Sequence, residues 1–232
     1  MYSPGVDDSD ALAAVAALAE PVRRDLYAYV RREARGVTRD EAAAHVGISR
    51  SLAAFHLDKL VAAGLLDART ADDAGRRIGR PPKTYRLSEL EVHVSIPARH
   101  YELAAELLVR AMVTGEREGT PPADALMSEA RHGGQEVGSR AREQLRRGPV
   151  GPERALSLAE DVAAESGFEP VRTDRRHVRL RNCPYQRLAQ HSRELICTMN
   201  AEFFSGVVDG IGGRVRVTLT PWEGHCCVEL RT

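Results

Sequence analysis

Residues Thr38–Leu66, TRDEAAAHVGISRSLAAFHLDKLVAAGLL, decide the fold of the N-terminal part of the chain. Thr38 has the side chain of a helix N-cap and acidic residues follow it, so we expect a short helix over residues 39–46. Gly47 suits a tight turn, and a second helix is expected to run from the following serines to Ala63. Two helices of about 8 and 14 residues joined through a glycine are typical of a DNA-binding helix-turn-helix.

The sequence on both sides extends this motif into a winged helix. Apolar residues at helical spacing predict one short helix before Pro21 and another that starts there and stops at Gly36. After the helix-turn-helix, residues 65–69 and 84–87 predict a two-stranded ribbon, which is the wing. We therefore expect residues 1–91 to form a winged helix-turn-helix DNA-binding domain.

The second helix of the motif is expected to enter the major groove of DNA, with its N-terminal residues at the base edges. Its polar side chains are the expected exposed readers, namely Ser49, Arg50, Ser51 and His56. The larger apolar residues of the same helix, Phe55 among them, are expected to pack inward.

Charge is distributed unevenly along the chain. The 33 lysine and arginine residues balance the 33 aspartate and glutamate residues, which argues against a protein that coats nucleic acid indiscriminately. Residues 49–87 nevertheless hold eight cations against four acids, a local charge of +4, and cations at a wing tip suit phosphates or a narrow minor groove. The expected DNA contacts are Thr38, Ser49, Arg50, Ser51, His56, Lys59, Arg76, Arg77, Arg80 and Lys83. A solvated hairpin used for protein contacts is the alternative interpretation.

Two further sections follow the winged helix. Residues 92–148 carry helical patterns, and the broad apolar stripe on a helix that begins near Pro97 suggests a dimerisation segment. In residues 149–232 helices alternate with strands, and the strict alternation of Arg214–Leu219 predicts a strand with one buried face. The whole chain is thus predicted to be an α+β protein, with an antiparallel sheet in the last section.

Cysteines occur only near the C-terminus. Cys183, Cys197, Cys226 and Cys227 all lie in the last 50 residues. No apolar run reaches the roughly 18 residues that span a bilayer, and the first ten residues do not resemble a secretory signal. We therefore expect a cytoplasmic protein with no membrane partner, in which clustered thiols are ligands or redox groups.

The spacing of the cysteines limits which of them can meet. Cys183 and Cys197 can share a site only if the chain bends between them, and Ser192 can cap a new helix after such a bend. Cys226 and Cys227 are expected on the last strand, so that their side chains point to opposite faces and only one of them joins a given site.

Three thiolates with a variable fourth ligand suit an iron–sulfur cluster in which one iron is not held by a cysteine. They also suit Zn²⁺ completed by a histidine, for which His191 and His225 are the candidates. The plain alternative is that the cysteines are small buried apolar side chains, as free cysteines often are.

Parts of the N-terminal sequence resemble a known family. FHLDKL at residues 55–60, AGLL at 63–66 and GRPPKTYRL at 79–87 look like bacterial winged-helix repressors of the broad ArsR-like group. The resemblance implies a cytoplasmic homodimer that reads an inverted-repeat operator in double-stranded DNA.

The C-terminal part resembles the regulators of iron–sulfur-assembly operons, known as the SufR type. The resemblance is carried by NCPY at residues 182–185, Cys197, Asn200, Gly206 and HCCV at residues 225–228. It implies a sensor that holds an iron–sulfur cluster, expected to be [4Fe–4S], through Cys183, Cys197 and one of Cys226 and Cys227.

The sequence therefore predicts a homodimeric transcriptional repressor whose C-terminal domain senses iron–sulfur or redox status. The alternative is a winged-helix regulator that binds a small organic effector or zinc in that domain. An enzyme is not expected: Cys183 and His191 could supply a thiol and a base, but no oxyanion-type glycine loop or carboxylate pair accompanies them.

Overall fold

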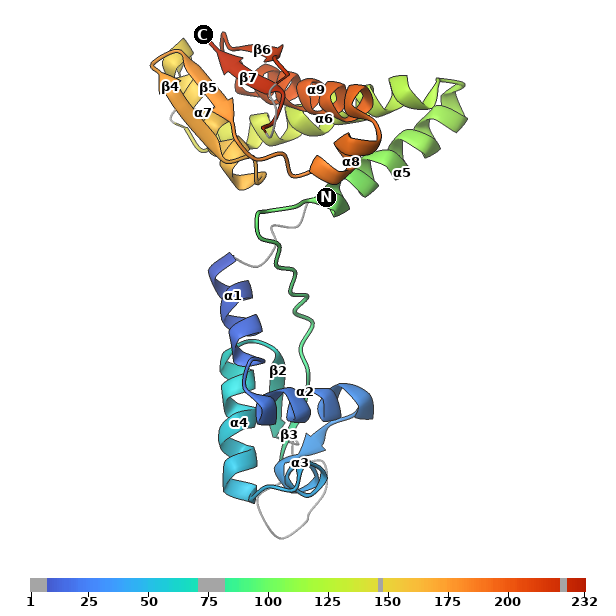
Figure 1. Cartoon of the computed structure of the whole chain (residues 1–232), viewed down its shortest axis with the longest axis vertical. Helices are drawn as coiled ribbons and strands as arrows, with labels where there is room; N and C mark the ends of the chain where they lie inside the picture. Colours follow the sequence, from blue (N-terminus) through green and yellow to red (C-terminus); the bar gives the residue numbers. More distant parts are fainter. Residues whose placement is uncertain (1–7, 71–81, 146–147, 222–224) are drawn as a thin grey trace. The chain divides into compact units, whose positions relative to one another are not determined.

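The computed structural model describes residues 8–70, 82–145, 148–221 and 225–232. The chain divides into two compact units, Met1–Val94 and Ser95–Thr232 (Figure 1). The second unit includes nearly all of residues 92–148 together with residues 149–232. No helix of the described residues is long and apolar enough to cross a membrane.

The N-terminal unit is a winged helix-turn-helix. Its elements are α1 (Asp8–Ala17), α2 (Pro21–Glu33), β1 (Val37–Thr38), α3 (Arg39–Val46), α4 (Arg50–Ala62), β2 (Leu66–Thr70) and β3 (Lys83–Leu87). The three strands form an antiparallel sheet in the order β1-β3-β2, in which Asp67 pairs with Arg86. Leu26, Leu57 and Tyr85 are among the fully buried residues that join the helices to this sheet.

Capping side chains set where these helices begin. The Thr38 hydroxyl accepts a hydrogen bond from the Glu41 N–H at 3.3 Å, and the Glu41 carboxylate accepts one from the Thr38 N–H at 2.8 Å. This capping box satisfies two backbone donors at the start of α3. Gly47 ends α3 in the left-handed region, at φ 73°, and Ser49 caps α4 through the Leu52 N–H. The predicted Thr38 cap and the predicted turn at Gly47 are confirmed.

The C-terminal unit combines helices with a second antiparallel sheet, so the α+β prediction is confirmed. Its elements are α5 (Tyr101–Glu118), α6 (Pro122–Glu143), α7 (Pro152–Glu165), β4 (Pro170–Asp174), β5 (His177–Leu180), α8 (Gln186–His191), α9 (Arg193–Ile211), β6 (Arg216–Leu219) and β7 (Val228–Arg231). The strand order is β4-β5-β7-β6. Both α7 and α9 pack against this sheet, and α9 runs along α6 (Figure 1).

Glycines bring α6 and α9 into backbone contact. A Cβ atom added at Gly134 would lie 1.9 Å from the Phe203 carbonyl oxygen, and one at Gly206 would lie 2.0 Å from the Arg131 carbonyl oxygen. Only residues without a side chain fit at such separations, so these positions fix how α6 sits on α9.

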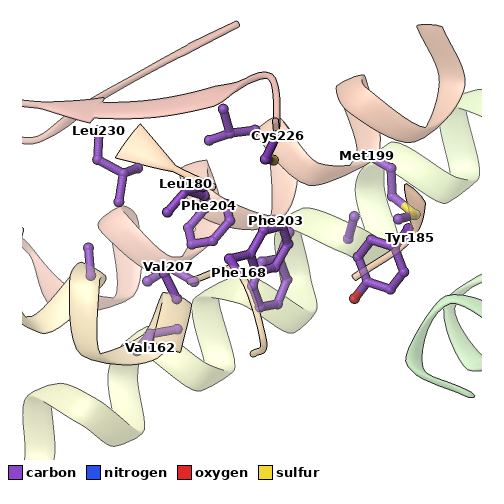
Figure 2. Close-up of a cluster of buried hydrophobic side chains, with 14 of the residues drawn as sticks. Val162, Phe168, Leu180, Tyr185, Met199, Phe203, Phe204, Val207, Cys226 and Leu230 are labelled. Carbon is purple, nitrogen blue, oxygen red and sulfur yellow. The ribbon is translucent and has the colours of Figure 1, made fainter. Parts of the chain in front are cut away.

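The core of the C-terminal unit lies between α9, α7 and the sheet. Phe168 packs edge-on against Phe204, with ring centroids 5.0 Å apart, and also contacts Tyr185. Figure 2 shows Phe168 and Phe204 near Leu180 and Val207, and Tyr185 near Met199, with Cys226 in the same cluster. One cysteine is therefore part of the hydrophobic core, which connects the core to the cysteine site described below.

Candidate functional site

The exposed start of α4 is the first candidate site. Ser49, Arg50 and Ser51 are exposed, as the sequence predicted. The Arg50 guanidinium contacts the carboxylate of Asp40 on α3, with Nε 2.5 Å from Oδ1. This ion pair links the two helices of the motif across the turn at Gly47 and holds the guanidinium beside the first residues of α4.

Two expectations about α4 are wrong. His56, predicted to be an exposed reader, is buried with only 8% of its surface accessible, and its Nδ1 lies 3.6 Å from a Glu20 carboxylate oxygen. Phe55, predicted to pack inward, is 54% exposed. The reason is helical phase: Ala53, His56, Leu57 and Leu60 form the buried face of α4, and Phe55 lies on the opposite side.

The wing strand β3 is tied to α4 by a charged contact. Lys83 Nζ lies 2.6 Å from Asp58 Oδ1, and the Tyr85 hydroxyl donates to the same oxygen at 3.1 Å. The hydrogen bond from Lys83 lowers the pKa of Asp58, and the same bond raises the pKa of Lys83. Lys83, predicted to contact DNA, is thus held beside the second helix of the motif by a carboxylate.

The remaining predicted DNA contacts fall into three groups. Lys59 is exposed on α4, with Nζ 5.7 Å from the centroid of the Phe55 ring. The hydroxyl of Thr38 is half-buried in the capping box, where it also donates to Glu41 at 2.8 Å. The predicted wing-tip contacts lie outside the described residues, namely Arg76, Arg77 and Arg80.

The second candidate site is a cavity of about 240 Å³ lined by all four cysteines. Cys183 precedes α8, Cys197 lies on α9, and Cys226 and Cys227 immediately precede β7. The prediction that Cys226 and Cys227 lie on a strand and face opposite ways is wrong. They occupy irregular backbone, where the alternation of an extended strand does not apply, so both of them reach the cavity.

The bend that brings the cysteines together occurs where the sequence predicted it. Helix α8 ends and α9 begins at Ser192, so the chain turns between Cys183 and Cys197. Ser192 itself makes no side-chain capping bond, which contradicts the predicted capping role. The turn is enough to bring the two thiols to one cavity.

Within the cavity the thiols are arranged as two pairs. Cys197 Sγ lies 3.3 Å from Cys227 Sγ, and Cys183 is hydrogen-bonded to Cys226. The bond with Cys226 lowers the pKa of Cys183 to about 7, whereas burial raises the pKa of Cys197 to about 12. All four cysteines are free thiols.

Polar side chains surround these thiols. Asn182 is buried beneath the site, where its Nδ2 donates to the Gly167 carbonyl at 2.6 Å, and Arg99 Nη1 donates to its Oδ1 at 2.5 Å. His225 lines the cavity. His191 bonds the Arg187 carbonyl oxygen through Nδ1 at 2.9 Å and is not among the lining residues. Of the two candidate histidine ligands, only His225 is therefore brought to the cysteines.

The described part of the chain holds no group of three or more histidine, cysteine, aspartate or glutamate side chains placed to bind a metal ion. Thiolates around one zinc ion must lie within about 4 Å of one another. Because no such group of three or more side chains is present among the described residues, the arrangement as it stands differs from a mononuclear zinc site.

Comparison with known proteins identifies the first site. A family model described as a helix-turn-helix domain matches residues 18–69, which include α2, α3 and α4. No curated protein and no solved structure matches the chain. The protein therefore carries a helix-turn-helix DNA-binding domain, which indicates a transcriptional regulator, and the family match does not extend to the cysteine site.

Proposed function

We propose that this protein is a homodimeric transcriptional regulator, a repressor, whose cysteine site senses iron–sulfur or redox status. The observation that carries the proposal is the convergence of four free thiols, from three separate segments, on one cavity of a chain with a helix-turn-helix. A structural role alone does not require cysteines to line a cavity.

The DNA partner is a double-stranded operator with an inverted repeat. Because a dimer places two recognition helices in successive major grooves, its half-sites lie about 34 Å apart or at a multiple of that spacing. The exposed residues Ser49, Arg50, Ser51 and Lys59 supply contacts from α4, and Lys83 supplies one from the wing. In the sequence, Arg76, Arg77 and Arg80 add positive charge between the two strands of the wing.

A second copy of the chain is the proposed partner of α5. Val109, Met112 and Val113 are 61–66% exposed and follow one another at helical spacing, so they form an apolar stripe. Covering such a stripe removes apolar surface from water, which is favourable. An inverted-repeat operator also requires two copies of the DNA-binding domain. Met112→Glu is expected to convert the dimer to a monomer in analytical ultracentrifugation, whereas Leu12→Glu, at an exposed apolar residue of α1, leaves the dimer intact.

The cysteine site would hold an iron–sulfur cluster. Such clusters are held by cysteine thiolates, and four cysteines line this one cavity. Cys183, Cys197, Cys226 and Cys227 would all hold it, whether as [4Fe–4S] or as a smaller cluster. When bound, the cluster supplies an iron centre whose charge changes with oxidation. The chain's own contribution is to orient the thiols and, through Asn182 and Arg99, to hold the segment that carries Cys183.

Anaerobic purification tests the sensing site. Ultraviolet–visible absorption, with analysis of iron and acid-labile sulfide, is expected to show a cluster in the wild-type chain. Cys183→Ser and Cys197→Ser are each expected to abolish it, and Cys226→Ser and Cys227→Ser are both expected to lower its iron content. Arg187→Ala, outside the cavity lining, is the control. A colourless protein without iron or sulfide would contradict the cluster and favour a small organic effector.

A further inference from the structure

The outer face of α4 carries an exposed apolar patch, formed by Leu52 and Phe55. Leu52 is 41% exposed and Phe55 is 54% exposed. Their spacing of three residues puts them on one side of the helix, together with Lys59, and the buried face of α4 lies opposite. Phosphate contacts do not explain large exposed apolar side chains in the first half of a helix expected to face DNA, because such contacts require charged or polar groups.

The surroundings of this patch indicate which ligand it meets. Arg50 and Ser51 immediately precede Leu52 at the start of α4, and the Lys59 ammonium lies over the Phe55 ring at 5.7 Å from its centroid. The patch is therefore apolar at its centre and positively charged at its margin. That combination suits the floor of a DNA major groove bordered by phosphates, and it belongs to the helix-turn-helix that the family match covers.

The major groove presents one apolar group to a reading helix, the C5-methyl of thymine. We propose that Leu52 and Phe55 contact thymine methyl groups in the operator, so that they determine specificity for thymine at defined positions of each half-site. Ser49, Arg50 and Ser51 read hydrogen-bonding edges nearer the start of α4. This inference rests on the proposed DNA-binding function.

Replacing thymine by uracil tests the inference, because uracil keeps the base pair and lacks only the methyl group. The full-length protein first selects its site from random double-stranded DNA. Deoxyuridine then replaces thymidine one position at a time, and the Kd is measured by fluorescence anisotropy at fixed salt. Burial of one methyl group corresponds to about a fourfold change in affinity, so we expect about fourfold weaker binding at one or more positions in each half-site.

Substitutions assign each methyl group to its reader. Phe55→Ala is expected to bind the thymine and uracil forms equally at one of the sensitive positions, and Leu52→Ala is expected to do so at another. Val15→Ala, at an exposed apolar residue of α1, keeps the full fourfold difference. Because Phe55 and Leu52 are exposed, circular dichroism should show both variants folded, and Phe55→Leu gives a milder change that keeps binding measurable.

The outcomes separate this inference from the function on which it rests. A selected operator whose uracil forms all bind as well as the thymine form would overturn the reading of methyl groups and leave DNA binding intact. A uracil effect that persists unchanged in Phe55→Ala and Leu52→Ala would overturn the assignment to this patch. The assignment would also fail if Leu52 and Phe55 bind a partner protein and their substitution leaves the operator affinity unchanged. A chain that selects no DNA sequence overturns the proposed function and this inference with it.

Discussion

The recognition helix and the cysteine site are built in contrasting ways. The start of α4 is positioned by groups close to it in sequence, namely its own Ser49 cap and the Asp40 carboxylate that contacts Arg50. The cysteine cavity instead takes its thiols from the segment before α8, from α9 and from the segment before β7. The first site depends on local chain geometry, whereas the second exists only after helices and sheet have packed together.

The largest expected effect comes from disturbing the long-range packing. Gly134→Ala places a methyl group 1.9 Å from a backbone oxygen of α9, so the two helices must separate. We expect the free energy of unfolding of the C-terminal unit to fall by about 3 kcal/mol, measured by chemical denaturation.

The neighbouring glycine provides the control. At Gly133 an added Cβ meets only Leu107, at 3.9 Å, so Gly133→Ala should leave stability unchanged or raise it by up to about 1 kcal/mol through helix propensity. Equal destabilisation by the two substitutions would show that contact between α6 and α9 does not hold the unit together.

A smaller effect on stability is expected from removing the N-cap of α3. Thr38→Ala removes the capping hydroxyl of α3 and should lower the free energy of unfolding of the N-terminal unit by about 1 kcal/mol. Thr38→Ser keeps a hydroxyl in the same place and should recover most of that loss in urea denaturation. If serine fails to recover stability, the capping bond is not the cause.

The smallest effect concerns acid stability of the same capping box. Hydrogen bonds from the Thr38 N–H, the Arg35 guanidinium and the Thr38 hydroxyl together lower the pKa of Glu41 from 4.5 to about 2. A depressed carboxyl pKa stabilises the folded state above pH 4.5, and this contribution disappears as the pH falls from 4.5 towards 2. Because the Glu41 side chain is 38% exposed, solvent screening keeps the effect small.

Substitution of Glu41 isolates this contribution. Glu41→Gln should lower the midpoint of thermal unfolding at pH 7 and change it little at pH 2, when followed by circular dichroism. An equal decrease in the midpoint of thermal unfolding at both pH values would contradict a role for the ionised carboxylate.

The same contrast explains how much could be predicted from the sequence. Thr38, Gly47 and the bend at Ser192 were predictable because caps and helix breaks are local signals. Phe55 and His56 were misassigned because polarity was used to choose the exposed face, whereas helical phase sets it. The geometry of Cys226 and Cys227 was missed because the start of β7 depends on its pairing with β5 and β6, which one strand's pattern does not reveal.

The packing of α6 on α9 is another long-range feature. The glycines of α6 and those of α9 lie far apart in sequence. Their contact makes one unit of the two sections, and no local pattern encodes it.

The central claim is that the state of the cysteine site controls DNA binding. It is tested most directly by the operator affinity of one preparation, measured anaerobically with its cluster and again after the cluster has been removed. We predict affinities that differ about tenfold or more, within the usual range of coupling between two sites, and that Cys197→Ser removes the difference. Equal affinities of the two forms in the wild-type chain would contradict the claim.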